Sequence, residues 1–232
     1  HGTAIVMAAA LINALKLAGK KIDEIRLVVN GAGAAGTAIA KFLMAFGVRD
    51  IVVCDRIGIL VDGDSRFTLP QQELAKVTNP RRLTGTLADA MKGADVFVGV
   101  SAPNCVTQDM VRTMAEKPIL FTCANPVPEI APEEALEAGA FIVGTGSSEY
   151  PNQINNVLVF PGLFRGALDV RASTVNFEMM MAASRGIAEC VSGAELRTDH
   201  ILPFAYDQSA HDSVAKAVSE AAIATGVSKL HR

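Results

Sequence analysis

The strongest constraint in this sequence is an apolar segment that runs directly into three closely spaced glycines. Leu27-Val28-Val29-Asn30 precedes Gly31-Ala32-Gly33-Ala34-Ala35-Gly36, and a helical pattern follows as far as Phe46. Where Gly-x-Gly-x-x-Gly joins a strand to a helix, the first glycine allows a tight turn, the second admits a pyrophosphate and the third lets the helix pack closely. Free N–H groups at the start of that helix attract phosphates. The segment predicts a dinucleotide site made of Gly31, Ala32, Gly33, Ala34, Ala35 and Gly36.

Short apolar segments alternate with helical segments over the rest of the chain, which is the pattern of βαβ units. We predict strands over residues 25–29, 51–54, 96–100, 119–122, 141–143 and 157–160. Helices are predicted over 4–18, 34–46, 71–77, 86–91, 108–116, 132–138, 163–170, 174–191 and 211–225, with a loop over 56–70. The expected fold class is α/β: a Rossmann-like, doubly wound, mostly parallel sheet flanked by N- and C-terminal helices, in a single domain over residues 1–232.

The composition argues against several classes of protein. The net charge is −3 and tryptophan is absent, so we expect no nucleic-acid partner and no binding to an anionic membrane. The apolar run over 4–17 is interrupted by Asn13 and Lys16 and is too short to cross a bilayer. The cysteines are scattered without metal-ligand spacing, which favours buried thiols in a reducing compartment and a cytoplasmic location. They are Cys54, Cys105, Cys123 and Cys190.

Ligands of an open parallel sheet bind at the carboxyl ends of its strands, so the residues after each predicted strand are candidates for a cofactor site. Asp55 follows the second strand, 24 residues after Gly31, near the spacing of an acid that binds a ribose. Its carboxylate favours NAD over NADP, whereas Arg56 beside it is able to hold a 2′-phosphate. Ser101 and Ala102, after the third strand, leave room for a nucleoside, and a plain turn explains them equally well.

Three asparagines carry amides that suit a substrate or cofactor. Asn125 follows the fourth predicted strand, and Asn155 and Asn156 close the loop after the fifth. At this edge of the sheet an amide can hold a carboxylate or the ribose of a nicotinamide nucleotide. Asparagine is also a common turn former, which is the simpler explanation from composition alone.

The sequence shows no evident acid–base group beside these candidates. Oxidation of a hydroxy acid needs an acceptor for the hydroxyl proton. The histidines lie at the termini or in the tail, no lysine ends a predicted strand, and no acidic cluster has spacing suited to Mg²⁺ or Mn²⁺. The histidines and tyrosines are His1, His200, His211, His231, Tyr150 and Tyr206. We therefore expect a chain that holds a cofactor but contributes no catalytic residue and no metal ligand.

Seven segments of the sequence resemble bacterial malic enzymes. They are 1–4 (His-Gly-Thr-Ala), 31–36, 54–58, 125–129 (Asn-Pro-Val-Pro-Glu), 155–157, 160–162 (Phe-Pro-Gly) and 164–172. These segments lie in the family's order, and the resemblance extends from the first residue to about residue 225.

The resemblance implies oxidative decarboxylation of (S)-malate to pyruvate and CO₂, with reduction of NAD or NADP. In that family a lysine takes the hydroxyl proton, a tyrosine assists reprotonation, and Mg²⁺ or Mn²⁺ polarises the oxaloacetate and stabilises the enolate. Asn125 matches the asparagine that we assign to the nicotinamide ribose and the malate carboxylate, and Asn156 matches a malate contact. Ile57 stands where many relatives carry a lysine, so the choice between NAD and NADP stays open.

The family's catalytic lysine and tyrosine and its metal-binding carboxylates precede the His-Gly-Thr segment. We therefore expect this chain to be the NAD(P)-binding part of a longer enzyme, inactive alone, with malate and pyruvate as small-molecule partners. The complete enzyme is expected to be a homodimer or a higher homo-oligomer. Two alternatives stay open: a self-standing NAD-binding module without turnover, and a malolactic enzyme or amino-acid dehydrogenase of the same fold.

Overall fold

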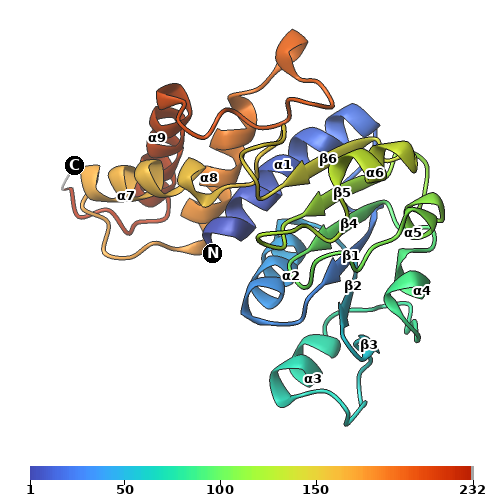
Figure 1. The fold of residues 1–232 in the computed structure, drawn as a ribbon. Coiled ribbons are helices and arrows are strands. Elements are labelled where there is room, and N and C mark those ends of the chain that lie inside the picture. Colours follow the sequence, from blue (N-terminus) through green and yellow to red (C-terminus); the bar gives the residue numbers. More distant parts are fainter. Residues whose placement is uncertain (231–232) are drawn as a thin grey trace.

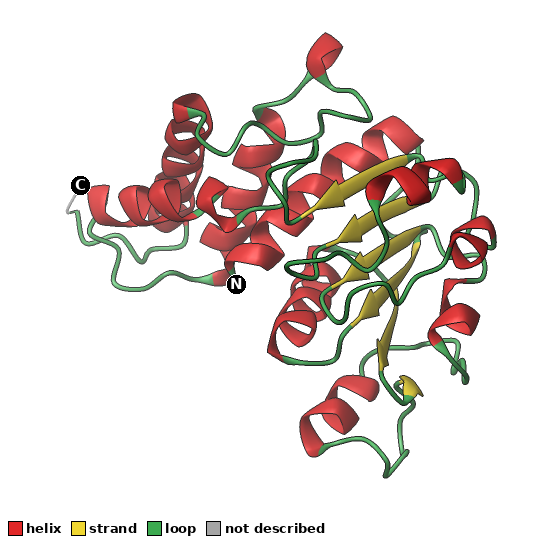
Figure 2. Cartoon of the chain, in the orientation of Figure 1, coloured by secondary structure: helices red, strands yellow, loops and turns green. Residues whose placement is uncertain are grey.

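The computed structural model describes residues 1–230 and contains a six-stranded sheet in the order β3-β2-β1-β4-β5-β6 (Figures 1 and 2). The strands are β1 (Arg26–Asn30), β2 (Asp50–Asp55), β3 (Gly58–Ile59), β4 (Val96–Gly99), β5 (Ile119–Thr122) and β6 (Ile142–Thr145). All neighbours pair in parallel except β2 and β3, which are antiparallel. The strand order reverses between β1 and β4, which places the ligand crevice of such a sheet at the carboxyl ends of these two strands.

The parallel strands are buried on both faces, because their side chains alternate between two apolar clusters. In β1, Leu27 and Val29 join one cluster and Val28 joins the other. Phe97 of β4 and Leu120 of β5 also belong to the second cluster. Successive side chains of a strand point to opposite faces. An uninterrupted apolar run is therefore what a sheet with both faces covered requires, and this confirms the predicted fold class.

Helices cover both faces of the sheet (Figure 1). Residues of the first cluster come from α1 (Gly2–Ala18), α2 (Ala34–Phe46) and α8 (Phe177–Glu189). Residues of the second come from α4 (Leu87–Met91), α5 (Gln108–Arg112) and α6 (Pro132–Glu137). The remaining elements are α3 (Leu69–Ala75), η1 (Asn156–Leu158), α7 (Phe160–Asp169), η2 (Gly193–Glu195) and α9 (Gln208–Ala224). Both α7 and α9 contact α8, which in turn packs against α1 (Figure 1).

The apolar segment 157–160 is not the strand that the sequence predicts. It contains the end of η1 and the start of α7. The Asn155 side chain accepts a hydrogen bond from the Val157 N–H at 3.0 Å and so caps a helical turn. Pro161 lies in the first turn of α7, where its missing N–H costs no hydrogen bond. Capping and proline placement therefore outweigh the β-propensity of this segment.

One strand of the sheet, β3, is not predicted from the sequence, because it lies inside the segment 56–70 that is predicted as a loop. Gly58 and Ile59 pair with Asp55 and Cys54 of β2. A Cβ on Gly58, whose φ is +125°, would overlap the carbonyl oxygen of Gly85, so the hairpin requires glycine here. A two-residue strand is too short for hydrophobic periodicity to reveal.

Helix boundaries differ from the predicted ones by a few residues. For α9 the structure places the start at Gln208 rather than 211, because the Asp207 side chain accepts a hydrogen bond from the Ser209 N–H at 2.9 Å. None of the helices within residues 1–230 is long and apolar enough to cross a membrane. His231 lies outside the described residues.

Asn13 is a polar side chain in the middle of the apolar α1. It is fully buried, and its Nδ2 donates to the Ala188 carbonyl at 2.8 Å and to the Ile201 carbonyl at 2.9 Å. These bonds join α1 to the end of α8 and to the segment before α9. Its Oδ1 accepts a hydrogen bond from the exposed Lys16 ammonium at 3.3 Å. The amide thus donates to two backbone carbonyl groups, of which that of Ala188 also accepts the Val191 N–H at 3.4 Å.

We expect Asn13→Ala to lower the free energy of unfolding by about 2–3 kcal/mol, because it removes two buried hydrogen bonds and opens a small cavity. Urea denaturation measures the change. Lys16→Ala on the same helix is the control and should change stability by less than about 0.5 kcal/mol, since Lys16 is exposed and its bond to Asn13 is long, at 3.3 Å. Equal losses in the two variants would contradict this role for Asn13.

Candidate cofactor and substrate site

The glycine turn, residues 31–36, joins β1 to α2 at the point where the strand order reverses. Gly31 has a φ of +119°, and a Cβ there would lie 2.7 Å from the Val100 carbonyl oxygen beyond β4. A Cβ on Gly36 would overlap the carbonyl oxygen of Gly31. These two glycines are therefore required by the fold itself, through a left-handed backbone at one position and close packing at the other.

Gly33 has no such structural requirement. Its φ is −83°, it is exposed, and an added Cβ would meet no atom within 4 Å. It is the N-cap of the 13-residue α2, whose first N–H groups donate no hydrogen bond to a capping side chain. Those N–H groups are free to bind an anion. The missing side chain at Gly33 leaves space above the turn for a ligand to reach them.

The first of two cavities beside the glycine turn, here called the Asp55 cavity, has a volume of about 300 Å³. Its lining includes Gly31, Asp55, Arg56, Ser101, Ala102 and Cys105. All but Cys105 are residues that the sequence predicts for the site. They meet because β2, β1 and β4 are neighbours, so that their carboxyl ends lie side by side.

Both carboxylate oxygens of Asp55 receive hydrogen bonds. The Arg56 backbone N–H donates to Oδ1 at 2.6 Å, and the Gln71 side-chain amide donates to Oδ2. Gln71 is itself held by the capping box of α3, in which the Thr68 N–H donates to its side-chain oxygen at 3.0 Å. The carboxylate is thus oriented by neutral donors and keeps its negative charge available to the cavity.

The second cavity, here called the Asn125 cavity, has a volume of about 450 Å³ and lies on the β5 side of the glycine turn. Its lining includes Thr3, Ala35, Ser101, Asn125, Asn155 and Asn156. The structure therefore brings the predicted residues Asn125 and Asn156 together although they are far apart in the sequence. Ser101 lines both cavities, so the two adjoin along the loop after β4.

The amides of Asn125 and Asn156 are exposed, and among residues 1–230 no hydrogen bond joins either side chain to another group. Asn155 differs, because its side-chain oxygen accepts the Val157 N–H as the cap of η1. The peptide bond between Asn125 and Pro126 is cis. The cavity thus contains two amides that are available to a ligand and one that is engaged in holding the backbone.

Two contributors to the site are missed by sequence reasoning. Thr3 reaches the Asn125 cavity from the first turn of α1, a long-range approach that no local pattern indicates. Glu129 is completely buried behind both cavities and accepts hydrogen bonds from the N–H groups of Ser101 and Ala124, each at 3.1 Å. Burial raises the pKa of its carboxyl, an effect that the backbone donors oppose. Nothing in the sequence around Glu129, which follows Asn-Pro-Val-Pro, indicates that its side chain is buried.

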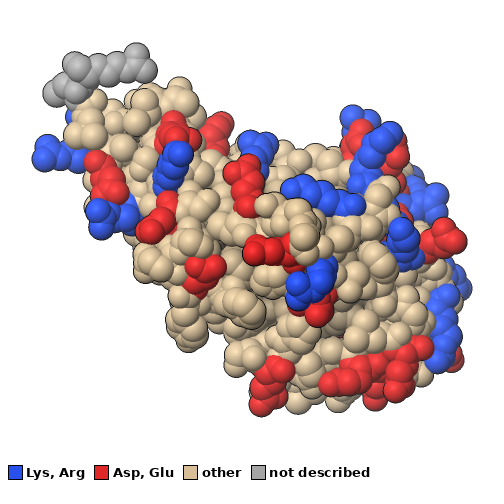
Figure 3. All heavy atoms as spheres, turned by 90° about the horizontal axis from the view of Figure 1, so that it is seen from above, with Lys and Arg blue, Asp and Glu red and all other residues tan. Residues whose placement is uncertain are grey.

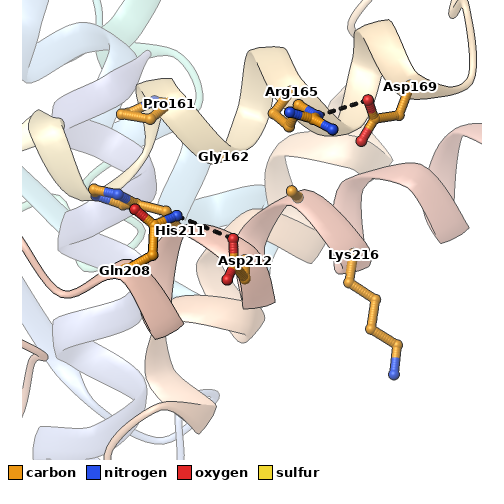
Figure 4. A pocket seen from close by; sticks show the side chains of 9 residues that line it. Pro161, Gly162, Arg165, Asp169, Gln208, His211, Asp212 and Lys216 are labelled. Carbon is orange, nitrogen blue, oxygen red and sulfur yellow. Dashed lines mark hydrogen bonds and ion pairs between the residues drawn. The ribbon is translucent and has the colours of Figure 1, made fainter.

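A hollow of about 550 Å³ between α7 and α9 lies outside this edge of the sheet (Figure 4). Two pairs of polar side chains lie within it. Arg165 pairs with Asp169 at 2.7 Å, and the Gln208 amide donates to Asp212 at 3.1 Å (Figure 4). The Lys216 side chain points away from these residues (Figure 4). His211 also lines the hollow, and its buried Nε2 has no hydrogen-bond partner among residues 1–230.

Within residues 1–230, no histidine, lysine or tyrosine lines the Asp55 or Asn125 cavity. In the same part of the chain, no group of three or more His, Cys, Asp and Glu side chains is arranged to hold a metal ion. On the molecular face in Figure 3, acidic and basic side chains lie near one another, and uncharged residues form much of the surface. The two cavities therefore present backbone and amide donors, one carboxylate and one guanidinium.

The chain matches the family model described as malic enzyme, NAD binding domain, over residues 1–223. It is 53% identical to the bifunctional malic/malolactic enzyme of Bacillus subtilis, over 99% of this chain and 56% of that protein. It is 49% identical to an NAD-dependent malic enzyme of Geobacillus stearothermophilus, over 99% of this chain and 48% of that protein. The chain thus spans about half the length of these two relatives.

Solved structures agree with the sequence relatives. The malic enzyme from Pyrococcus horikoshii has a TM-score of 0.94 at 42% identity, over 100% of this chain and 55% of that one. The NAD-dependent malic enzyme from Thermotoga maritima has a TM-score of 0.89 at 48% identity, over 94% of this chain and 57% of that one. These matches confirm the resemblance predicted from the sequence: the chain belongs to the malic enzyme family and corresponds to its NAD-binding domain.

Proposed function

We propose that residues 1–232 form a single NAD-binding domain that serves a malic enzyme in the oxidative decarboxylation of (S)-malate to pyruvate and CO₂. The observation that carries this proposal is the pair of cavities on either side of an uncapped helix N-terminus. A dinucleotide has two nucleoside halves joined by a pyrophosphate. The arrangement of two cavities with an anion-binding turn between them matches that shape.

Each part of the dinucleotide is assigned to the glycine turn or to one of the two cavities. The pyrophosphate lies over the glycine turn, where residues 31–36 supply backbone N–H groups. The adenosine enters the Asp55 cavity, whose carboxylate accepts the ribose hydroxyls, and Ser101 and Ala102 leave space for it. The nicotinamide nucleoside enters the Asn125 cavity, beside Ala35 and Ser101.

We assign NAD as the preferred dinucleotide. Asp55 is held by two neutral donors, so no cation offsets its charge within its own hydrogen bonds. A 2′-phosphate on the adenosine ribose would approach that carboxylate and be repelled. Arg56 is exposed and reduces this repulsion without abolishing it, because its side chain is free to move in solvent.

Malate is assigned to the part of the Asn125 cavity next to the nicotinamide position. The Asn125 and Asn156 amides donate to its carboxylates and orient the carbon that carries the hydroxyl. Thr3 borders the same space from α1 and adds a hydroxyl donor. Bound NAD supplies the hydride acceptor of the reaction. The described residues thus bind and orient both reactants.

The proton-transfer groups and the metal come from elsewhere in this proposal. Among residues 1–230 the two cavities carry only Asp55 and Arg56 as charged side chains, and no acidic cluster there fits Mg²⁺ or Mn²⁺. We assign the proton-transfer groups and the metal ligands to another part of a longer protein, one that would correspond to the portion of the relatives that this chain does not cover. The homo-oligomeric state and the cytoplasmic location stay predictions.

The bifunctional relative at 53% identity makes a malolactic reaction the second candidate. Both reactions begin with the same substrate and dinucleotide, and the described residues bind these two molecules without determining which product is released. Release of pyruvate or of lactate distinguishes the two reactions. A binding module without turnover is the third candidate, and it is compatible with two cavities that the described residues line without acid–base groups.

The proposed function is tested by NADH binding, followed by the enhancement of nicotinamide fluorescence. The chain should bind NADH, and Gly33→Val should weaken binding by about 100-fold or more, because the new side chain occupies the space of the pyrophosphate. The melting temperature should fall by no more than about 4 °C, since an added Cβ would meet no atom within 4 Å and the remaining cost is that of valine at a helix N-cap.

The matched control for Gly33→Val is Ala38→Val, one turn further along α2 and half-buried. It should leave the dissociation constant for NADH unchanged within about twofold. A Gly33→Val chain that binds NADH normally would show that the glycine turn is not the phosphate site.

Cofactor choice is tested with Asp55→Asn. The amide keeps the size of the side chain but removes its charge, so the preference for NADH over NADPH should fall by about tenfold, or ~1.4 kcal/mol. Competitive titration with both nucleotides measures the ratio. The control is Asp62→Asn, an exposed carboxylate in the loop before α3. A chain whose preference survives Asp55→Asn does not select its cofactor through this carboxylate.

Because the proton-transfer groups and the metal ligands are assigned to another part of a longer protein, the 232-residue chain alone should produce no NADH from malate and NAD, even with Mn²⁺ present. Absorbance of NADH over time is the measurement, and a complete malic enzyme under the same conditions is the positive control. Turnover by the chain alone would mean that its own residues supply the proton-transfer groups, which would contradict their assignment to another part of a longer protein.

A further inference from the structure

Glu129 is a carboxylate that the proposed binding of cofactor and substrate does not use. Its side chain is completely buried, and its two oxygens are engaged with two different loops. Oε1 accepts the Ser101 N–H at 3.1 Å from the loop after β4. Oε2 accepts the Ala124 N–H at 3.1 Å from the loop after β5. One side chain thus joins the carboxyl ends of two adjacent strands.

The surroundings of Glu129 are shaped to receive this carboxylate. A Cβ on Gly99, the last residue of β4, would overlap the carboxyl group, so the absence of a side chain there makes room for it. The backbone beside it is also held, since the Val106 N–H donates to the Glu129 carbonyl at 3.0 Å and the Asn104 N–H donates to the Pro128 carbonyl at 3.0 Å. The carboxylate therefore has one position available to it.

Among residues 1–230, the groups that face Glu129 include no cation. The charged and polar influences on it are the N–H groups of Ser101 and Ala124 and its own backbone N–H. The thiols of Cys105 and Cys123 lie near it, and burial raises the pKa of both, so they stay neutral. A buried carboxylate without a cationic partner is stabilised by these hydrogen bonds, and it holds the donors as firmly as they hold it.

The loops that Glu129 joins form the wall of the Asn125 cavity. Ser101 and Ala124 both line this cavity, and Asn125 follows Ala124 directly. Ser101 also borders the Asp55 cavity, but Ala124 does not line it. A loss of the Glu129 bonds should therefore affect the cavity proposed for nicotinamide and malate more than the cavity proposed for adenosine.

We infer that Glu129 is a positioning residue that holds the loops after β4 and β5 together and so shapes the nicotinamide half of the cofactor site. This inference rests on the proposed function, because it needs a dinucleotide in the two cavities. Glu129 touches no space assigned to cofactor or substrate, so it acts only through Ser101, Ala124 and the neighbouring Asn125.

The test is Glu129→Gln in the 232-residue chain, with Glu134→Gln as the control. Glutamine has nearly the same volume, so it still fills the space beside Gly99. Its NH₂ group cannot accept a hydrogen bond, so one of the two backbone N–H groups loses its partner. Glu134 is exposed on α6, and among residues 1–230 its side chain makes no hydrogen bond.

The readout is the dissociation constant for NADH compared with that for AMP. Glu129→Gln should weaken NADH binding by about tenfold or more while changing AMP binding by less than about twofold. A general loss of structure would weaken both nucleotides together. The exchange rates of the Ser101 and Ala124 amide hydrogens should rise in the variant and stay unchanged in Glu134→Gln.

A second measurement follows NADH binding as the pH changes. Protonation of Glu129 removes an acceptor, and burial places its pKa above the ordinary value. The affinity of the unmodified chain for NADH should therefore fall as the pH is lowered from about 8 to about 5.5, and this decline should be smaller in Glu129→Gln, which has no carboxyl group at this position. AMP is not the reference here, because its own phosphate titrates at about pH 6. Glu134→Gln should show the same decline as the unmodified chain.

The inference is overturned if Glu129→Gln leaves the ratio of NADH to AMP affinity unchanged, whether both affinities stay the same or both fall equally. If the unmodified chain binds AMP but not NADH, or neither, the proposed function fails and the inference fails with it. Faster amide exchange at Ser101 and Ala124 in that case would show that Glu129 stabilises the loops without serving a cofactor.

Discussion

The close approach of α2 to the ends of β1 and β4 is the contact on which the rest of the site depends. Gly36 packs directly on the Gly31 carbonyl, and Gly31 lies against the Val100 carbonyl. No side chain fits between these backbones, so the first turn of α2 is brought to the crevice with its N–H groups uncovered. The same contact separates the Asp55 cavity from the Asn125 cavity and places both within reach of one extended ligand.

The three glycines of the turn serve different purposes. Gly31 and Gly36 are required by the chain's own backbone, whereas an added Cβ on Gly33 would meet no atom within 4 Å. The sequence motif does not distinguish the three positions. Their surroundings in the folded chain separate the two glycines that maintain the fold from the one that the proposed function assigns to a ligand.

The chemistry of the two cavities is that of binding and orientation. Asp55 and Arg56 are their charged side chains, and the amides of Asn125 and Asn156 provide neutral donors and acceptors. The buried Glu129 adds a charge behind the cavity wall, where it fixes backbone N–H groups without contact to a ligand. This arrangement suits a domain that presents a cofactor to acid–base and metal groups assigned to another part of a longer protein.

The sequence by itself determined the α/β class, the glycine turn and the position of Asp55, because these depend on local periodicity and short spacings. It was misleading at residues 157–160, where capping by Asn155 and the placement of Pro161 favour helix over strand, and it did not reveal the two-residue β3. Only the tertiary structure brought Thr3 from α1 beside Asn156 and buried Glu129 under two strand ends. Such contacts join segments that are distant along the chain, and their energies come from packing and burial, which no local pattern records.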